Sequence, residues 1–80
     1  KEQRFPGGKL ELHLNIASGR IEDLQIFGDF FGTLPVEELA QKLNGRQYRE
    51  SDVAEALAEL DFSQYFLGIT QAEFLECLFS

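Results

Sequence analysis

Several residue types are scarce in this chain of 80 residues, and each shortage narrows its possible functions. A single cysteine excludes an internal disulfide and any metal site built from several cysteines. The seven lysines and arginines are outnumbered by fourteen aspartates and glutamates, which argues against nucleic acid as a partner, since phosphate binding needs a clustered basic face. No apolar run approaches the roughly 18 residues of a membrane span, and nothing resembles a signal peptide. The composition predicts one small, acidic, soluble domain in the cytoplasm, with little room for a deep substrate cavity.

Methionine is absent altogether, so the sequence lacks an initiator residue. We therefore expect either that residues were removed or that the 80 residues are a piece of a longer polypeptide. The net charge of −7 is also uneven, because residues 21–80 hold three basic and twelve acidic side chains while residues 1–20 hold four and two. This asymmetry predicts an acidic, solvated second half and a more neutral first half that is available for docking.

Apolar and polar residues alternate in two stretches of the first half, which is typical of half-buried strands. The expected inward residues are Leu10, Leu12, Leu14 and Ile16 in one strand, then Leu24, Ile26 and Phe30 in the next. A two-residue Ser18-Gly19 loop alone would set Leu14 opposite Asp23. We therefore predict that an odd-length loop or, preferably, one β-bulge restores the facing of apolar side chains.

A third strand is expected before the turn residues Phe5-Pro6-Gly7-Gly8. Two strands make only a marginal sheet, and the few residues that precede this turn can supply another. The first half is therefore predicted to be a small antiparallel meander of about three strands.

Three helices are predicted in the second half. The first opens at Pro35, and its buried stripe is Val36, Leu39, Ala40 and Leu43. The second has Ser51 as its N-cap, and its buried face is Val53, Ala56, Leu57 and Leu60. An apolar connector follows, in which Phe62, Tyr65, Phe66 and Leu67 are expected to pack on the core.

The third helix has the clearest start signal, because Thr70 and Glu73 have the spacing of a capping box. Ile69 and Phe74 stand at the positions of a hydrophobic staple, and the stripe continues through Leu75, Leu78 and Phe79. Strands followed by helices predict an α+β domain with the three helices packed on one face of the sheet.

Neither the histidine nor the cysteine is predicted to form an active site. His13 lies on the outward face of a strand, without a nucleophile at a useful spacing. Cys77 is interpreted as a small buried hydrophobe, and the alternative is a reactive thiolate, which nearby Glu73 and Glu76 disfavour. The acidic residues lack calcium-loop spacing, and no glycine-rich phosphate loop is present, so no catalytic, cofactor or metal residues are predicted.

The run Phe27-Gly28-Asp29-Phe30-Phe31-Gly32 leaves two interpretations open. In one, Phe30 belongs to the core, Phe31 covers the helices and Asp29 forms a turn. In the other, part of this aromatic edge faces a partner, because exposed aromatic patches mark interfaces.

A series of short runs extends along the whole chain in a recognisable order. They are Arg4–Leu12, Asn15-Ile16, Gly19–Ile21, Ile26–Phe31, Val36–Leu39, Leu43–Gly45, Ala56-Leu57 and Tyr65–Thr70. In this order they resemble the C-terminal accessory domain of bacterial lipoate–protein ligases. The most specific part is Gly28-Asp29-Phe30-Phe31 after the hairpin.

The resemblance implies that residues 1–80 are one accessory domain of a longer enzyme and are inactive alone. The larger domain of such a ligase is implied to use ATP, Mg and lipoate to form lipoyl-adenylate, and to pass the lipoyl group to a lysine of an acceptor lipoyl domain. Its catalytic and binding residues have no counterparts here. The implied partner is that catalytic domain, with Phe5, Gly8, Asp29 and Phe31 near the inter-domain surface. The alternative is a stand-alone sulfur-acceptor or protein-interaction module of similar fold.

Overall fold

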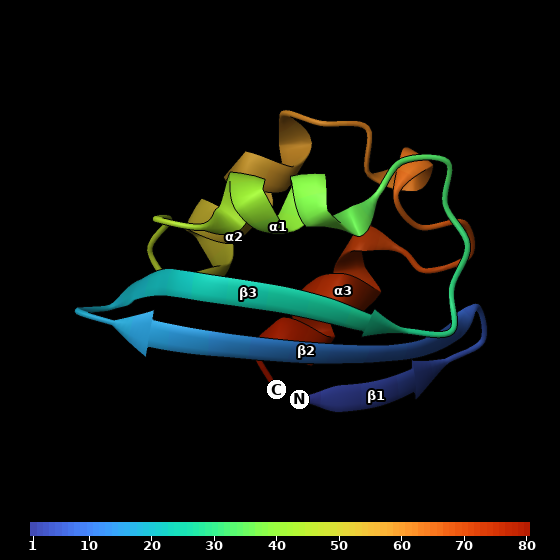
Figure 1. Ribbon diagram of the computed structural model, residues 1–80, viewed down its shortest axis with the longest axis horizontal. Coiled ribbons are helices and arrows are strands. Elements are labelled where there is room, and N and C mark those ends of the chain that lie inside the picture. Colours follow the sequence, from blue (N-terminus) through green and yellow to red (C-terminus); the bar gives the residue numbers. More distant parts are fainter.

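A computed structural model describes residues 1–80 and shows three antiparallel strands followed by three α-helices (Figure 1). The predicted α+β architecture is confirmed. The elements in chain order are β1 (Glu2–Phe5), β2 (Gly8–Ala17), β3 (Arg20–Gly28), α1 (Val36–Leu43), α2 (Glu50–Ala58), a short 3-10 helix (Phe62–Gln64) and α3 (Gln71–Leu78). None of the helices is long and apolar enough to cross a membrane.

The β2–β3 hairpin contains the predicted bulge. Ser18 and Gly19 form a two-residue turn, and both have positive φ, as a type I′ turn requires. The register then shifts by one residue, so that Glu22 is left without a partner and Leu14 faces Leu24. Beyond this bulge, the apolar side chains of β2 and β3 share one face of the sheet.

The apolar face of the hairpin is buried for only part of its length. Leu10, Leu12 and Ile26 are buried, whereas Ile16 is 43% exposed. The expectation that Ile16 points into the core is therefore wrong. The tip of the hairpin extends beyond the helices, as Figure 1 shows, so an apolar residue there has nothing to pack against.

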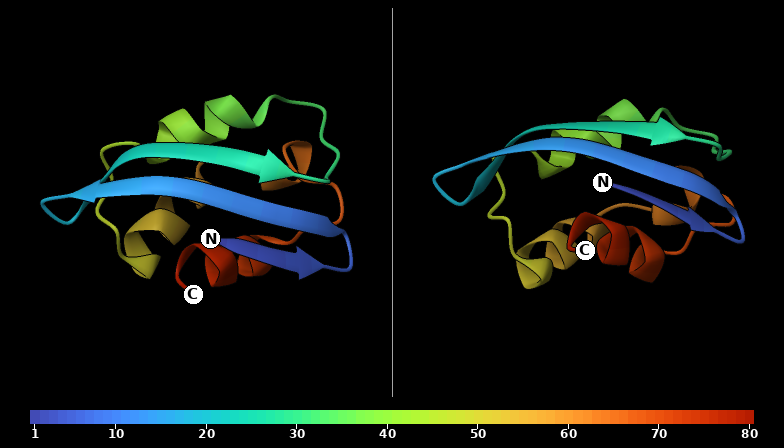
Figure 2. Two further views of the ribbon diagram at one scale, coloured as in Figure 1. Left: turned by 60° about the horizontal axis from the view of Figure 1, so that its bottom comes forward. Right: turned by 90° about the horizontal axis from the view of Figure 1, so that it is seen from below.

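The predicted third strand is confirmed as β1, which pairs with β2 through a Pro6-Gly7 turn that sets Phe5 opposite Gly8. The chain start is anchored next to this strand. The backbone N–H of Leu12 donates to the carbonyl of Lys1, and the Lys1 ammonium group donates to the carbonyls of Leu78 and Ser80. The two ends of the described chain therefore lie side by side (Figure 2).

Helices α1 and α2 bury most of the residues expected from their spacing, whereas Val36 and Leu60 are only partly buried and Leu60 follows the end of α2. The buried residues are Leu39, Ala40 and Leu43 in α1, and Val53, Ala56 and Leu57 in α2. The N-cap of α2 is Arg49, and the predicted cap Ser51 lies inside the first turn. The earlier start fits an ion pair between Arg49 and Asp52 at 2.9 Å, which joins the cap residue to the first turn.

The N-terminus of α3 is fixed by the predicted capping box. The backbone N–H of Glu73 donates to the Thr70 hydroxyl at 3.1 Å, and the Thr70 N–H donates to the Glu73 carboxylate at 2.9 Å. Ile69 and Phe74, the expected staple residues, are both buried. These two hydrogen bonds give acceptors to two backbone N–H groups that otherwise have none at the start of a helix.

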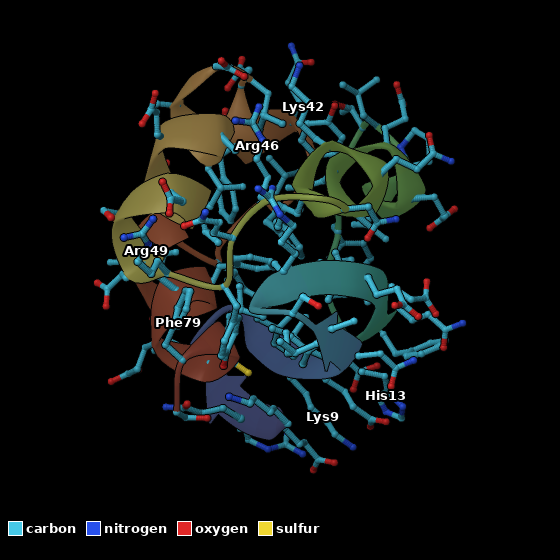
Figure 3. All side chains as sticks on the ribbon, turned by 90° about the vertical axis from the view of Figure 1, so that its left-hand side faces the viewer. Lys9, His13, Lys42, Arg46, Arg49 and Phe79 are labelled. Atoms are coloured by element: carbon cyan, nitrogen blue, oxygen red, sulfur yellow. The ribbon has the colours of Figure 1, made fainter.

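The helices enclose one core against the sheet. Helix α3 packs on β1 and β2, α1 lies along β3, and α2 contacts both α1 and α3 (Figures 1 and 2). The ring of Phe66 joins the loops to this core, because it lies 5.7 Å from the ring of Phe74 and 4.8 Å from that of Phe30. The opposite face of the sheet carries polar side chains such as Lys9 and His13 and has no helix over it (Figure 3).

Replacing the cap residue should measure the contribution of the capping box. We expect Thr70→Ala to lower the free energy of unfolding by about 1 kcal/mol, because the Glu73 N–H loses its acceptor. Thr70→Ser keeps the hydroxyl and should stay within a few tenths of wild type. Urea denaturation followed by circular dichroism tests both, and equal losses for the two variants would contradict a capping role.

Candidate docking surface

Three loops meet at the end of the sheet opposite the hairpin tip, and glycines allow their backbones to touch. A Cβ atom at Gly7 would lie 1.9 Å from the carbonyl oxygen of Gly68, and one at Gly32 would lie 2.2 Å from that of Tyr65. At Gly8 it would lie 1.7 Å from the carbonyl oxygen of Asp29. Any larger residue at these positions would push the loops apart.

Backbone hydrogen bonds join the same loops. The N–H of Leu67 donates to the carbonyl of Phe31 at 2.7 Å, and the N–H groups of Thr33 and Leu34 both donate to the carbonyl of Gln64. The Asp29 N–H donates to the carbonyl of Lys9 at 3.0 Å. These bonds hold the loops in one arrangement, so the side chains that they carry are presented on a fixed backbone.

Two large apolar side chains on this backbone point to solvent. Phe31 is 78% exposed and Leu67 is 54% exposed, and the two residues are neighbours in an isolated β-bridge. This exposure contradicts the interpretation in which Phe31 covers the helices, and the expected packing of Leu67 on the core is wrong. Their exposure favours the interpretation in which the aromatic edge faces a partner, whereas Phe30 packs against the core.

The structure brings three of the four predicted interface residues together. Gly8, Asp29 and Phe31 line one groove of about 450 Å³ with Pro6, Gly7, Gly28 and Phe30. Phe5, the fourth, is buried in the core and does not line this groove. We call the groove with its exposed neighbour Leu67 the Phe31 surface. Periodicity did not identify Leu67 as a surface residue, because its exposure depends on the bridge to Phe31.

His13 and Glu11 form an isolated pair on the open face of the sheet. Their side chains are hydrogen-bonded, and the edge of the His13 ring packs on Phe27 at 5.3 Å. This hydrogen bond lowers the pKa of the Glu11 carboxyl. The chain has no group of three or more histidine, cysteine, aspartate or glutamate side chains that could hold a metal ion.

Cys77 is fully buried in α3, as the sequence predicts. Burial raises the pKa of its thiol, and the thiol donates its one hydrogen bond to the carbonyl of Leu10 at 3.9 Å. Sulfur acceptance requires an accessible thiolate, so the environment of Cys77 disfavours the sulfur-acceptor alternative.

Alanine substitutions at two glycines should distinguish the cost of a steric conflict from the cost of an unfavourable backbone conformation. Gly32 has an ordinary φ but no room for a Cβ atom, whereas Gly45 has a φ of +88° and open space around it. We expect Gly32→Ala to cost about 3 kcal/mol of unfolding free energy through steric conflict. Gly45→Ala should cost about 1 kcal/mol through backbone strain alone. Urea denaturation measures both, and a Gly32→Ala cost no larger than that of Gly45→Ala would contradict the described loop contact.

Thiol labelling should test the burial of Cys77. We expect a water-soluble maleimide to react with the native chain at least ~100-fold more slowly than with the urea-unfolded chain, because the sulfur becomes accessible only when α3 opens. Mass spectrometry over time measures the two rates. Comparable labelling rates for the native and the unfolded chain would support a reactive role for this thiol.

The comparisons with known proteins agree with the motif order. The family model described as the C-terminus of bacterial lipoate protein ligase matches residues 1–78. The chain is 42% identical over 77 residues to lipoate-protein ligase LplJ of Bacillus subtilis, covering 96% of this chain and 23% of that protein. It is 36% identical over 80 residues to a lipoate–protein ligase of Streptococcus pyogenes, covering 100% of this chain and 24% of that protein. The chain thus spans about a quarter of the length of these relatives, and it belongs to the family of bacterial lipoate–protein ligase C-terminal domains.

Proposed function

We propose that residues 1–80 are the accessory domain of a cytoplasmic lipoate–protein ligase and that they assist the larger part of that enzyme without carrying catalytic groups. The family match over residues 1–78 supports the assignment. The relatives that carry the name lipoate–protein ligase are about four times as long, which leaves ample chain for a separate catalytic domain.

In this proposal the larger part activates lipoate with ATP and Mg and transfers the lipoyl group to an acceptor lysine. The residues of this chain do not fit the phosphates of ATP or a bound Mg ion, because they include no glycine-rich phosphate loop and no cluster of metal ligands. The contribution of this domain is therefore a surface that contacts the catalytic domain, and no chemical step passes through its side chains.

One observation carries this role, namely the exposure of Phe31 and Leu67 on a backbone held by glycine contacts and hydrogen bonds. Such preformed apolar side chains dock with little loss of conformational entropy. Docked over the catalytic domain, the Phe31 surface would help to exclude water from a reactive acyl-adenylate and to control when the acceptor enters, as closing lids do.

Truncating the exposed aromatic side chain should weaken this assistance. We expect Phe31→Ala in the full-length ligase to lower the rate of lipoyl-adenylate formation about tenfold, the loss typical of an interface anchor. The measurement is single-turnover formation of lipoyl-adenylate from lipoate and ATP. Asp29→Ala tests the polar part of the same surface and should give a smaller reduction.

The matched control is Ile16→Ala, because Ile16 is also an exposed apolar residue but lies near the hairpin tip. It should leave the rate unchanged. Equal rates for wild type, Phe31→Ala and Ile16→Ala would exclude the Phe31 surface from activation. Equal rates with and without the whole domain would exclude an activating role altogether.

A further inference from the structure

Strand β2 is longer than β1, so part of its outer edge has no partner strand. The ladder between the two strands continues one residue beyond β1, because the main-chain nitrogen of Lys1 donates to the carbonyl of Leu12 at 2.7 Å and the Leu12 N–H donates back at 2.6 Å. Beyond Leu12, β2 runs on to Ala17, and no strand lies along its outer edge there (Figures 1 and 2). We call this edge of His13–Ala17 the free edge.

The backbone of the free edge offers unpaired hydrogen-bonding groups. In an antiparallel sheet, successive residues of a strand direct their N–H and C=O groups to opposite neighbours. Because these groups of Leu12 point to β1, those of Leu14 point to the same edge, and no backbone hydrogen bond outside the ladders involves Leu14. A hollow of about 550 Å³ lies beside this edge, and its lining includes Lys1, Leu12, His13 and Leu14. The edge therefore has both the groups and the space to accept another strand.

The composition of the free edge indicates that it is covered in the complete protein. Exposed edge strands are usually protected by lysines, by inward-pointing charges or by proline, because an unprotected edge pairs with other chains. The residues His13–Ala17 include no lysine, no acid and no proline. Leu14 is apolar and only partly buried. An edge of this kind requires a partner strand.

The chain before residue 1 is the segment best placed to cover this edge. The matched family is the C-terminus of the ligase, and the relatives are about four times as long as this chain, so under the proposed function the larger part precedes Lys1. Lys1 is already in register with β2, and its ammonium group donates to the carbonyl of Leu78 at 2.7 Å and to the hydroxyl of Tyr48 at 2.6 Å. These contacts fix the direction in which the chain enters the sheet. A second copy of the domain would lack this continuity.

We propose that the segment of the ligase directly before Lys1 continues β1 along the free edge as far as Asn15. The register of the ladder sets the first three residues, counted back from Lys1, opposite His13, Leu14 and Asn15 in turn. The register of β2 with β3 shifts after Asn15, where the bulge twists the hairpin, and the regular ladder ends there. We expect an apolar side chain at the second of these positions, because it lies beside Leu14 on the side of the helices.

This inference rests on the proposed function and adds to it, since it names the contact that joins the two parts of the enzyme. Three paired residues span about 10 Å, so flexible chain between the parts can begin only that far from Lys1, toward the hairpin tip. The Phe31 surface lies at the opposite end of the sheet. A small rotation at the paired segment therefore moves the Phe31 surface through a large distance.

An engineered disulfide in the full-length ligase tests the predicted register. His13 and the residue directly before Lys1 would form a non-hydrogen-bonded pair, whose Cα atoms lie about 4.5 Å apart, within the range of a disulfide. The variant combines His13→Cys with a cysteine at that upstream position. Oxidised glutathione accepts the two electrons and two protons that the thiols lose, and Cys77 is fully buried and stays reduced. We expect the intramolecular disulfide to be the main product, identified by mass spectrometry of the unreduced digest.

The matched control is Asn15→Cys with the same upstream cysteine. Asn15 is also exposed and lies on the same face of β2, but it is two positions out of register. Diagonal neighbours are about 7–8 Å apart, which is too far for a disulfide, so we expect about tenfold less of it at equal times.

Hydrogen exchange in the unmodified full-length ligase gives a second measurement. We expect the N–H of Leu14 to exchange at least ~100-fold more slowly than the N–H groups of Glu2 and Arg4, which point away from β2 at the outermost edge of the sheet. Two-dimensional NMR spectra recorded during exchange into heavy water measure these rates. Equal rates for the three groups would contradict a strand along the free edge.

The possible outcomes distinguish this inference from the proposed function. Equal disulfide yields for the His13 and Asn15 variants would overturn the predicted register, and disulfides between two copies would assign the edge to a second copy. If Phe31→Ala slows adenylate formation but no disulfide forms in register, the proposed function stands and the continued strand fails. If the disulfide forms but Phe31→Ala has no effect, the activating role fails and the continued strand stands.

Discussion

The close approach of three loops at the end of the sheet is the constraint on which the rest of the structure depends. It requires glycine at positions 7, 8 and 32, because a Cβ atom there would overlap a backbone carbonyl. Once the loops touch, Phe66 packs between Phe30 and Phe74 and joins them to the core. The same contact between the loops turns Phe31 and Leu67 outward. The packing of Phe66 and the exposure of these two side chains therefore have the same cause.

Polar and apolar surfaces are divided between different parts of this small domain. The uncovered sheet face carries paired polar side chains such as His13 and Glu11, and the loop end carries the apolar side chains of Phe31 and Leu67. A chain of this size can bury only one core, so its surface has to provide the remaining functions. Docking on a larger domain requires a surface of this kind and does not require a substrate pocket.

Features set by local sequence were predictable, and those set by distant contacts were not. The capping box of α3 depends on residues three apart, and the bulge follows from counting residues around a two-residue turn. The exposure of Leu67 depends on its bridge to Phe31, 36 positions earlier, which no periodicity reveals. The gathering of Gly8, Asp29 and Phe31 in one groove was expected only from a family resemblance, because it is a tertiary feature that no local pattern reveals.

Because of the bulge in β3, the number of residues in this strand matters more than the side chain at the bulged position. Glu22 is exposed and faces no residue of β2, yet it separates Ile21 from Leu24 by the spacing that lets both be buried. Deleting this residue would turn the buried side chains on one side of the turn to the solvent face of the sheet, and the exposed ones to the core. A deletion there would therefore be far more harmful than any substitution. The fold requires that a residue is present at position 22, and it accepts almost any side chain there.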